Sequence, residues 1–332
     1  MVVTRRGIGL VVAGLALAVA VPACTDPTPG APDAEVTIGL TYVPNVQFAP
    51  FYLAQQRGYF EDEGVAVTLR HHGESEDLFG AMAADLEQLV VAGGDEMLQA
   101  VSAGEDVVSV ATLYQEYPVT LIVPDDSAVN SPSDLADMTI GIPGPFGETY
   151  FGLLAMLSAN DLSRSDVTIE SIGFTQQAAL AAGHVDAVMG FVNNDVPQFQ
   201  ATGLPVRVVE TGDLPLVGIS LGTTSHMRNY QAETLSGVLR AVGRAIADIS
   251  AEPDLAVDAT EQQIPGTVTD DQRAIMTEVA TATVALYGPT GDGWGEQDDQ
   301  RWQAMASAMH DLGLLAGAVD AEVAYTNDFV AQ

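Results

Sequence analysis

The sequence predicts an α/β protein of two lobes that are joined by two extended crossings. Apolar runs of strand length alternate with segments of helical spacing along the chain, as in largely parallel α/β sheets. Roughly 300 residues follow the leader, enough for two lobes with cores of their own. A change in composition at Pro124-Asp125-Asp126-Ser127 indicates the first crossing, and a later strand indicates the return.

The first 23 residues have the pattern of a signal peptide. Two arginines precede an apolar run over residues 8–21, which is too short to span a bilayer but suits the apolar region of a signal peptide. The run ends in Val21-Pro22-Ala23-Cys24, which resembles a bacterial lipobox, and Cys24 is the only cysteine. We therefore expect a lipoprotein signal peptide over residues 1–23 and a lipidated Cys24. The alternative is a plain secretory signal with an incidental cysteine.

The segment after Cys24 and the overall charge restrict the partners. Residues 24–35 are rich in Pro, Gly, Asp and Ala and predict a flexible tether. The chain has no lysine, and its 11 basic residues face 45 acidic ones; without the two leader arginines the balance is 9 − 45 = −36. Such a body repels nucleic acid and anionic lipid, so we expect no nucleic-acid partner and membrane contact only through the lipid anchor. Either salt adaptation or genomic bias could explain the acidity.

The first lobe is predicted to comprise residues 36–124 and 222–332. Apolar runs predict its strands at residues 36–42, 65–70, 88–92, 107–113 and 119–123. Helical spacing predicts helices between them, at residues 51–56, 77–84 and 97–102. From residue 227 onward, Leu, Val, Ala and Met recur at helical spacing, so the C-terminal part is predicted to be mainly helical.

The second lobe is predicted to comprise residues 125–221. Its strands are expected at residues 139–142, 167–172, 187–191 and 206–210, with helices between them. A strand over residues 215–221 leads back to the first lobe. Ligands of open α/β sheets bind outside the carboxyl ends of the strands, so the loops after the strands are where we expect the functional residues.

The loop after the first strand, residues 42–52, combines two prolines, several aromatic rings and two amide side chains. It is suited to gripping a flat, partly polar molecule. Its candidate ligand-binding residues are Asn45, Gln47 and Phe48, although Phe48 could instead be a core residue.

The loop over residues 141–150 is rich in glycine. Glycines let a ligand approach the backbone, and free N–H groups at the start of the next helix favour acceptor or anionic groups. The loop lacks the Lys-Ser/Thr of a P-loop and a complete dinucleotide fingerprint, so we do not predict nucleotide hydrolysis. Its candidate residues are Gly144, Phe146, Gly147, Glu148, Thr149 and Tyr150.

A third loop, residues 190–197, follows a strand directly and offers Phe191, Asn193, Asn194 and Asp195. The amides can donate and accept, whereas an ionised Asp195 only accepts, for example from an amino group of a heterocycle. Asp195 could equally be a helix N-cap. Further candidates occupy comparable positions after other strands, namely Gly94, Asp95, Tyr114 and Gln176.

Other polar residues carry weaker signals. His71 and His72 stand near two glutamates, but adjacent residues on an extended chain point in opposite directions, so we expect surface histidines and no metal site. We find no G-x-S-x-G, H-E-x-x-H or paired-carboxylate arrangement. The sequence therefore predicts a protein that is not an enzyme and needs no cofactor.

Taken together, several segments resemble the NMT1/THI5-like and SsuA-like solute-binding proteins of ABC importers: residues 42–54, 58–60, 64–65, 141–150, 183–188 and 190–197. The likeness extends over roughly residues 36–221. It implies a type II periplasmic-binding-protein fold, in which two doubly wound α/β lobes close on a small molecule about two hinge crossings. It also implies an extracytoplasmic location, a permease and an ATPase as partners, and a monomer.

Members of this family bind thiamine-precursor pyrimidines, riboflavin, nitrate, alkanesulfonates or taurine. In pyrimidine binders, the segment matching residues 190–195 is a Gly, two aromatics, an Asn, an aromatic and an acid that contacts the pyrimidine amino group. Asp195 stands at the acid and Asn193 at the Asn, but Val192 and Asn194 replace aromatics. This departure leaves room for another ring, riboflavin included.

The aromatic and amide side chains in the loops favour an aromatic N-heterocycle, with a thiamine-precursor pyrimidine placed ahead of riboflavin. A small anion would call for a cationic clamp, and arginine is scarce in these loops. The family also contains an enzyme, the fungal thiamine-pyrimidine synthase, which uses a cysteine-rich motif, a histidine and iron. That cysteine motif is missing here.

Overall fold

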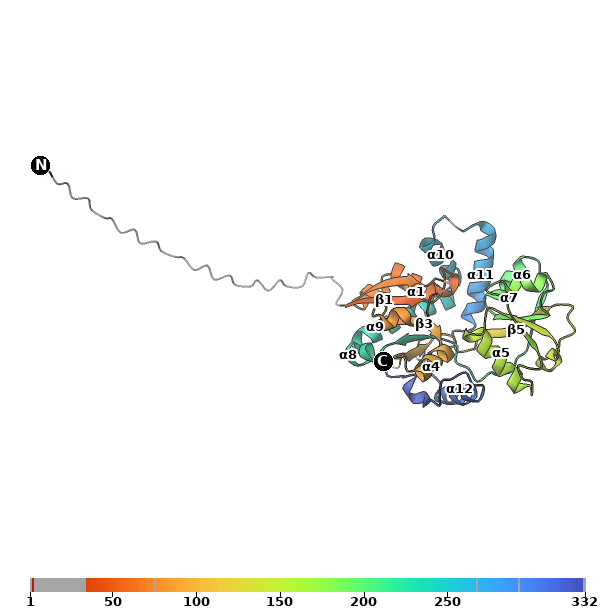
Figure 1. Cartoon of the computed structure of the whole chain (residues 1–332). Helices are drawn as coiled ribbons and strands as arrows, with labels where there is room; N and C mark the ends of the chain where they lie inside the picture. Colours follow the sequence, from red (N-terminus) through yellow and green to blue (C-terminus); the bar gives the residue numbers. More distant parts are fainter. Residues whose placement is uncertain (1, 3–33, 74–75, 267, 292, 331–332) are drawn as a thin grey trace. The chain divides into compact units, whose positions relative to one another are not determined.

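The computed structural model describes residues 2, 34–73, 76–266, 268–291 and 293–330 (Figure 1). Nearly all of the predicted signal peptide, Cys24 and residues 24–33 of the predicted tether lie outside this range. Residues 34 and 35, the predicted end of the tether, instead begin the first strand and pair with Val65 and Ala66. Within the described ranges, no helix has the length and hydropathy that crossing a membrane requires.

The first sheet has five strands in the order β2-β1-β3-β10-β4. Strand β1 pairs in parallel with β2 and β3, whereas β10 is antiparallel to both of its neighbours. The strands are β1 (Ala34–Leu40), β2 (Val65–His71), β3 (Leu89–Gly93), β4 (Val108–Thr112) and β10 (Ile219–Thr223). All residues of β3 and β4 are buried, which explains why neither strand alternates between apolar and charged residues.

The second sheet repeats this plan in the order β7-β6-β8-β5-β9. Strand β6 pairs in parallel with β7 and β8, and β5 is antiparallel to β8 and β9. The strands are β5 (Val119–Pro124), β6 (Thr139–Ile142), β7 (Thr168–Ser171), β8 (Ala187–Phe191) and β9 (Val206–Val209). In each sheet the antiparallel strand is the first one after the chain arrives from the other sheet. This is the type II periplasmic-binding-protein fold.

One strand belongs to a different sheet from the one predicted. The run at residues 119–123 was assigned to the first lobe, but β5 pairs with β8 and β9 in the second sheet. Five of its six residues are buried, and a buried apolar run carries no sign of which sheet it enters. The chain therefore passes between the sheets along residues 113–118 and returns along residues 210–218.

Helices cover both sheets. Around the first sheet lie η1 (Val46–Phe48), α1 (Ala49–Gln56), α2 (Tyr59–Asp62), α3 (Gly80–Ala83), α4 (Gly94–Ala103), α8 (Ser225–Tyr230), α9 (Ala232–Ala251) and α10 (Asp254–Gln263). Beside the second lie α5 (Gly147–Ala159), α6 (Gln176–Ala181), α7 (Asp195–Ala201) and the short η2 (Pro132–Leu135). Helix α9 buries Leu235, Val238, Leu239, Val242 and Ile246 on one stripe, the spacing expected of an amphipathic helix.

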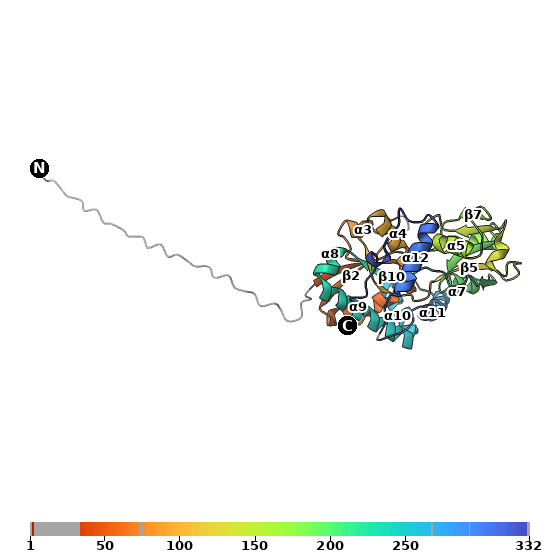
Figure 2. The ribbon, with the colours of Figure 1, turned by 90° about the horizontal axis from the view of Figure 1, so that it is seen from below.

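Two C-terminal helices connect the parts of the body. Helix α11 (Asp270–Val284) contacts both η1 and α7, and so links the first sheet's loops to the second sheet's helices. Helix α12 (Asp299–Asp311) lies beside α5, and its Trp302 and Met305 belong to the core cluster of the second sheet (Figure 2). The η3 turn (Ala321–Val323) packs against α12. The C-terminal region therefore supports both sheets.

Candidate ligand-binding site

Loops at the carboxyl ends of strands from both sheets meet around Tyr114. This buried residue follows β4, and its hydroxyl lies within hydrogen-bonding reach of Gln47 after β1, Asn193 after β8 and Thr283 on α11. Burial raises the pKa of the Tyr114 hydroxyl, and the nearby Glu148 carboxyl adds to the shift. The sequence-predicted residues Gln47, Tyr114, Glu148 and Asn193 are therefore neighbours in the folded chain.

A second tyrosine ties together the two helix starts that flank this point. The Tyr117 hydroxyl donates to the Asp95 carboxylate at the start of α4, at 2.7 Å. It also lies 2.9 Å from the main-chain carbonyl oxygen of Glu148, at the start of α5. Helix α4 follows β3 of the first sheet and α5 follows β6 of the second. Asp95 and Glu148 are thus held on opposite sides of the boundary between the sheets.

Three carboxyl groups gather at this boundary without a basic partner. Burial raises the pKa of Asp95 well above its usual range, and the charge of Glu96 adds to this effect. Burial likewise raises the pKa of Glu148, with additions from Asp95 and Glu96, and it raises that of Glu96 to about 7. None of the ion pairs found in the described ranges involves these groups. The site thus favours neutral carboxyl groups and disfavours an anionic ligand.

The loop after β1 is held by its own side chains. The Asn45 carboxamide caps η1 by accepting from the Gln47 main-chain N–H, at 3.0 Å. The Phe48 ring is buried and meets the His71 ring edge-on at 5.6 Å between centroids. Of the three candidates in this loop, Gln47 is the one that reaches Tyr114.

The glycine-rich loop places only part of its predicted residues at the boundary. Gly147 has a φ of +69° and begins α5, where a Cβ would stand 3.1 Å from the Glu96 carboxylate. Gly144 gives room to the exposed ring of Phe146, which comes within 2.2 Å of a Cβ built there. Thr149 is buried in the first turn of α5.

Tyr150 is turned away from the site. It stands two residues after Glu148, about 200° around the helix at 3.6 residues per turn. Its ring is in the second sheet's core cluster, beside Phe151 and under the Arg164 guanidinium at 5.7 Å. The sequence analysis places Tyr150 in the loop, whereas in the structure α5 already begins at Gly147.

The turn between β8 and α7 is closed by Asp195. Its carboxylate accepts from the Phe191 main-chain N–H at 2.6 Å, and burial raises its pKa to about 6. Asn194, not Asp195, is at the N-cap position of α7, and the side-chain Oδ1 of Asn194 accepts from the Gln198 side-chain amide at 2.8 Å. Asp195 therefore holds the turn ahead of the helix rather than capping it.

Two further candidates have packing roles. The Gly94 N–H donates to the main-chain oxygen of Gly218 at 3.0 Å, and a Cβ at Gly94 would stand 2.6 Å from Val217. Gln176 is buried at the start of α6. Across the sheets, the rings of Tyr42 after β1 and Phe174 after β7 meet at 5.6 Å.

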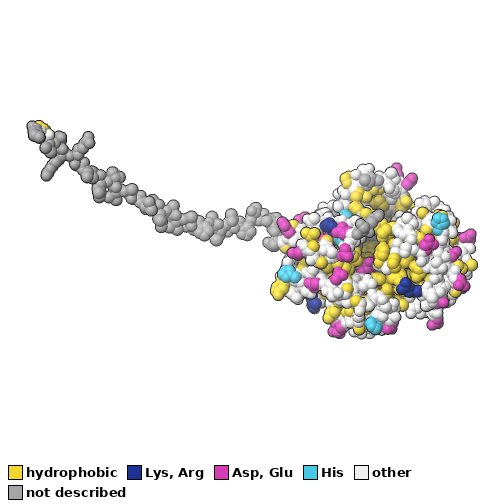
Figure 3. All heavy atoms as spheres, in the orientation of Figure 1, with side chains coloured by type: hydrophobic (Ala, Val, Ile, Leu, Met, Phe, Trp, Pro, Cys, Tyr) yellow, Lys and Arg dark blue, Asp and Glu magenta, His cyan; other side chains and the backbone are white. Residues whose placement is uncertain are grey.

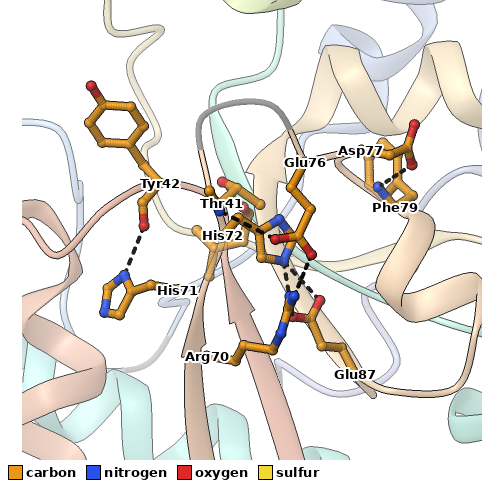
Figure 4. A network of polar contacts seen from close by, with 11 residues as sticks. Thr41, Tyr42, Arg70, His71, His72, Glu76, Asp77, Phe79 and Glu87 are labelled. Carbon is orange, nitrogen blue, oxygen red and sulfur yellow. Dashed lines mark hydrogen bonds and ion pairs between the residues drawn. The ribbon is translucent and has the colours of Figure 1, made fainter.

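A separate polar cluster surrounds the two adjacent histidines. His71 and His72 point to opposite sides of their strand, as predicted (Figure 4). His72 is not a surface residue, however: it is buried, and its Nε2 lies 2.9 and 3.0 Å from the two carboxylate oxygens of buried Glu87. Arg70 bridges Glu87 and Glu76. In the described part of the chain, no three His, Cys, Asp or Glu side chains are arranged to hold a metal ion.

Sequence reasoning missed three contributors to the site. Tyr117 lies in the connection between β4 and β5. This connection leads from one strand to another and contains no strand-to-helix turn, the kind of position from which most candidates were predicted. Glu96 stands one residue after the predicted Asp95, and its carboxylate accepts from the Gly93 N–H at 3.0 Å. Thr283 belongs to a helix 90 residues after Asn193, yet accepts from its amide at 2.9 Å. Spacing alone could have indicated Glu96; nothing in the sequence brings α11 to this place.

Comparison with known proteins identifies the family. The sequence model described as NMT1/THI5 like matches residues 45–256, which is more than half of the chain. The protein belongs to the NMT1/THI5-like family. A relative from Chloroflexus aurantiacus, the riboflavin-binding protein RibY, is 33% identical over 342 aligned residues that cover 96% of each chain. The formylaminopyrimidine-binding protein of Halalkalibacterium halodurans is 24% identical over 88% of this chain and 89% of its own.

The fold of this NMT1/THI5-like protein also occurs in solved structures. The periplasmic aliphatic sulphonate binding protein SsuA from Escherichia coli superposes with a TM-score of 0.71 at 16% identity, over 87% of this chain and 91% of its own. At such identity the likeness concerns the fold. The predicted family and the predicted fold class are both confirmed.

Proposed function

We propose that this protein is the extracytoplasmic solute-binding component of an ABC importer and that its ligand is riboflavin or a closely related flavin. The observation that carries the proposal is the 33% identity to RibY along 96% of both chains. The sequence analysis favours a thiamine-precursor pyrimidine over riboflavin as the ligand. The identity to RibY reverses this preference.

The chemistry of the site supports a neutral, ring-shaped ligand. The side chains that meet around Tyr114 are amides, a hydroxyl and a carboxyl, and none of them is basic. Nitrate or a sulfonate would bring its charge to a buried place where these side chains offer no cation to balance it. In the space-filling view, hydrophobic side chains gather in the middle of the face shown, with acidic side chains scattered around them (Figure 3).

Binding is proposed to proceed by hinge closure without chemical change of the ligand. The lobes are taken as the two sheets with their helices, and residues 113–118 and 210–218 as the hinge crossings. A ligand that touches loops of both lobes favours the closed state, which then docks on the permease. The protein would act as a monomer, with no cofactor.

The proposal is tested by titrating the purified protein with riboflavin and following the quenching of flavin fluorescence. We expect saturable one-to-one binding and recovery of unaltered riboflavin by chromatography. Nitrate, taurine and an alkanesulfonate at equal concentration serve as controls and should not displace the flavin. Absence of flavin binding, or conversion of the flavin into a product, would overturn the proposal.

A thiamine-precursor pyrimidine remains the second candidate, since Asp195 stands at the acid of pyrimidine binders and a formylaminopyrimidine-binding relative matches most of the chain. The same titration, with the pyrimidine as competitor, separates the two. If the pyrimidine displaced riboflavin at equal or lower concentration, the pyrimidine would be the preferred ligand.

Anchoring through Cys24 is proposed from the lipobox-like sequence around it. We predict that Cys24→Ser moves the protein from the membrane fraction of the producing cells to the soluble extracytoplasmic fraction. A Ser substitution keeps the size of the side chain but removes the thiol that would be acylated. Unchanged fractionation of the variant would exclude the anchor.

A further inference from the structure

The Glu148 side chain lies across the boundary between the two sheets. It starts from α5 of the second sheet, and its Cγ and Cδ come within 2.8 and 3.0 Å of a Cβ built on Gly93, the last residue of β3 in the first sheet. Glycine at 93 therefore leaves the room that this carboxyl occupies. The residue is only 7% exposed, so a ligand would reach it through the hinge opening that the proposed function requires.

Two buried acceptor atoms at this place have no hydrogen-bond partner within the described part of the chain: Oε1 of Glu148 and Oδ1 of Asn193. The Asn193 amide nitrogen, by contrast, donates to Thr283 at 2.9 Å. Both residues are neighbours of Tyr114. A buried polar atom that stays unpaired destabilises the protein, so a donor from outside the chain is favoured at this site.

We propose that Glu148 recognises a ligand edge on which a ring N–H lies beside a carbonyl group, the arrangement of a cyclic imide, and that Asn193 binds a second polar group of the same ligand. This inference rests on the proposed flavin ligand, whose ring system carries such an edge. The Glu148 carboxyl would accept from the N–H and donate its own proton to the adjacent carbonyl. The Asn193 oxygen would accept from a further donor of the ligand.

The protonation of Glu148 decides which edge fits. A neutral carboxyl offers a donor and an acceptor side by side, whereas an ionised one offers acceptors only. Burial, together with the charges of Asp95 and Glu96, raises the pKa of Glu148, so the neutral form is favoured. An imide edge therefore complements the neutral carboxyl, as would any edge with one donor beside one acceptor, whereas only an edge with two donors, such as that of a protonated aminopyrimidine, would complement the ionised carboxyl.

The test uses the full chain, riboflavin and 3-methylriboflavin, in which a methyl group replaces the imide hydrogen. We expect the methylated flavin to bind unmodified protein about fivefold to 150-fold more weakly, the ratio that corresponds to about 1–3 kcal/mol. In Glu148→Ala, riboflavin affinity should fall by a similar factor and the difference between the two flavins should disappear. Glu148→Gln, an isostere of the neutral acid, should restore the preference for riboflavin over the methylated flavin that Glu148→Ala loses.

The pH dependence adds an independent readout. Riboflavin affinity of unmodified protein should fall as pH rises and Glu148 ionises, while that of Glu148→Gln should stay flat over the same range. Equal affinity for both flavins, or full flavin affinity in Glu148→Ala, would overturn the inference and leave the proposed function standing. If unmodified protein bound no flavin at all, the proposed function itself would fail. Melting curves confirm that both variants are folded.

Discussion

Single atoms decide how closely the loops of this protein approach one another. Gly94 is an example. Any other residue at this position would carry a Cβ, and that Cβ would stand 2.6 Å from Val217 and 3.4 Å from Trp302. That distance is below ordinary van der Waals contact, so one of these neighbours must move. Gly94 thus sets the packing between the start of α4, the returning crossing and α12.

We predict that Gly94→Ala destabilises the protein by about 1–3 kcal/mol, the usual cost of overpacking a filled core. Gly317→Ala is the matched control, since a Cβ there meets nothing within 4 Å. Urea unfolding measures both variants. If Gly94→Ala unfolded at the same urea concentration as the control, the packing described around Val217 would be wrong.

At this scale the sequence identified many of the side chains but could not tell their directions. Gln47, Asp95, Glu148 and Asn193 were all predicted from their positions after strands, and they do converge. Tyr150 was also predicted, yet faces the core, because the exact start of a helix fixes which residues turn inward. Gly93 shows the same limit: its lack of a Cβ matters only because the Glu148 side chain fills the space beside it, which the sequence does not reveal.

Among the helices and strands, helix α11 has the role that the sequence predicts least. It contacts η1 and α7, and its Thr283 accepts a hydrogen bond from Asn193 across 90 residues of sequence. Thr283 also donates to the Val279 main-chain oxygen at 2.7 Å, which fixes its hydroxyl. The helix therefore orients the Asn193 side chain at the candidate site.

We predict that Thr283→Val destabilises the protein by about 1–3 kcal/mol, because the buried Asn193 amide loses its acceptor. Thr281→Val is a close control, since the Thr281 hydroxyl bonds back to Thr277 in the same way but is exposed. The control should change stability by less than about 0.5 kcal/mol. Equal effects of the two substitutions, by thermal unfolding, would show that the bond to Asn193 contributes nothing.

Strands were easier to predict than their sheet membership. Residues 139–142 and 187–191 were expected as strands with the same bounds that β6 and β8 have. The strand at 119–123 was also expected, but its sheet was wrong, since pairing depends on residues far away in sequence. Helix α11 could be expected as a helix, whereas its place between η1 and α7 depends on how the whole C-terminal region folds back.

For the molecule as a whole, the charge balance couples folding to pH. In the folded state burial raises the pKa of Glu96 from 4.5 to about 7 and that of Asp195 from 3.8 to about 6. The folded protein then binds more protons than the unfolded chain between these values. The stability that these two groups contribute therefore falls as pH rises across this window, and it is lost above their folded pKa values.

We predict that the melting temperature declines between about pH 4.5 and pH 7 and that Glu96→Gln makes the decline shallower. Gln keeps an acceptor for the Gly93 N–H but does not ionise. Glu278→Gln, at an exposed position of α11, should leave the slope as it is. A melting temperature that rises with pH in this range would contradict the assignment of buried, proton-holding carboxyl groups.

The central claim is that the loops of the two sheets jointly hold one flavin-like ring. A crystal structure of the protein grown with riboflavin tests it most directly. We predict that the ring lies between the sheets, in contact with Tyr114, Glu148 and Asn193. Riboflavin bound elsewhere, or contacting the loops of one sheet only, would contradict the account.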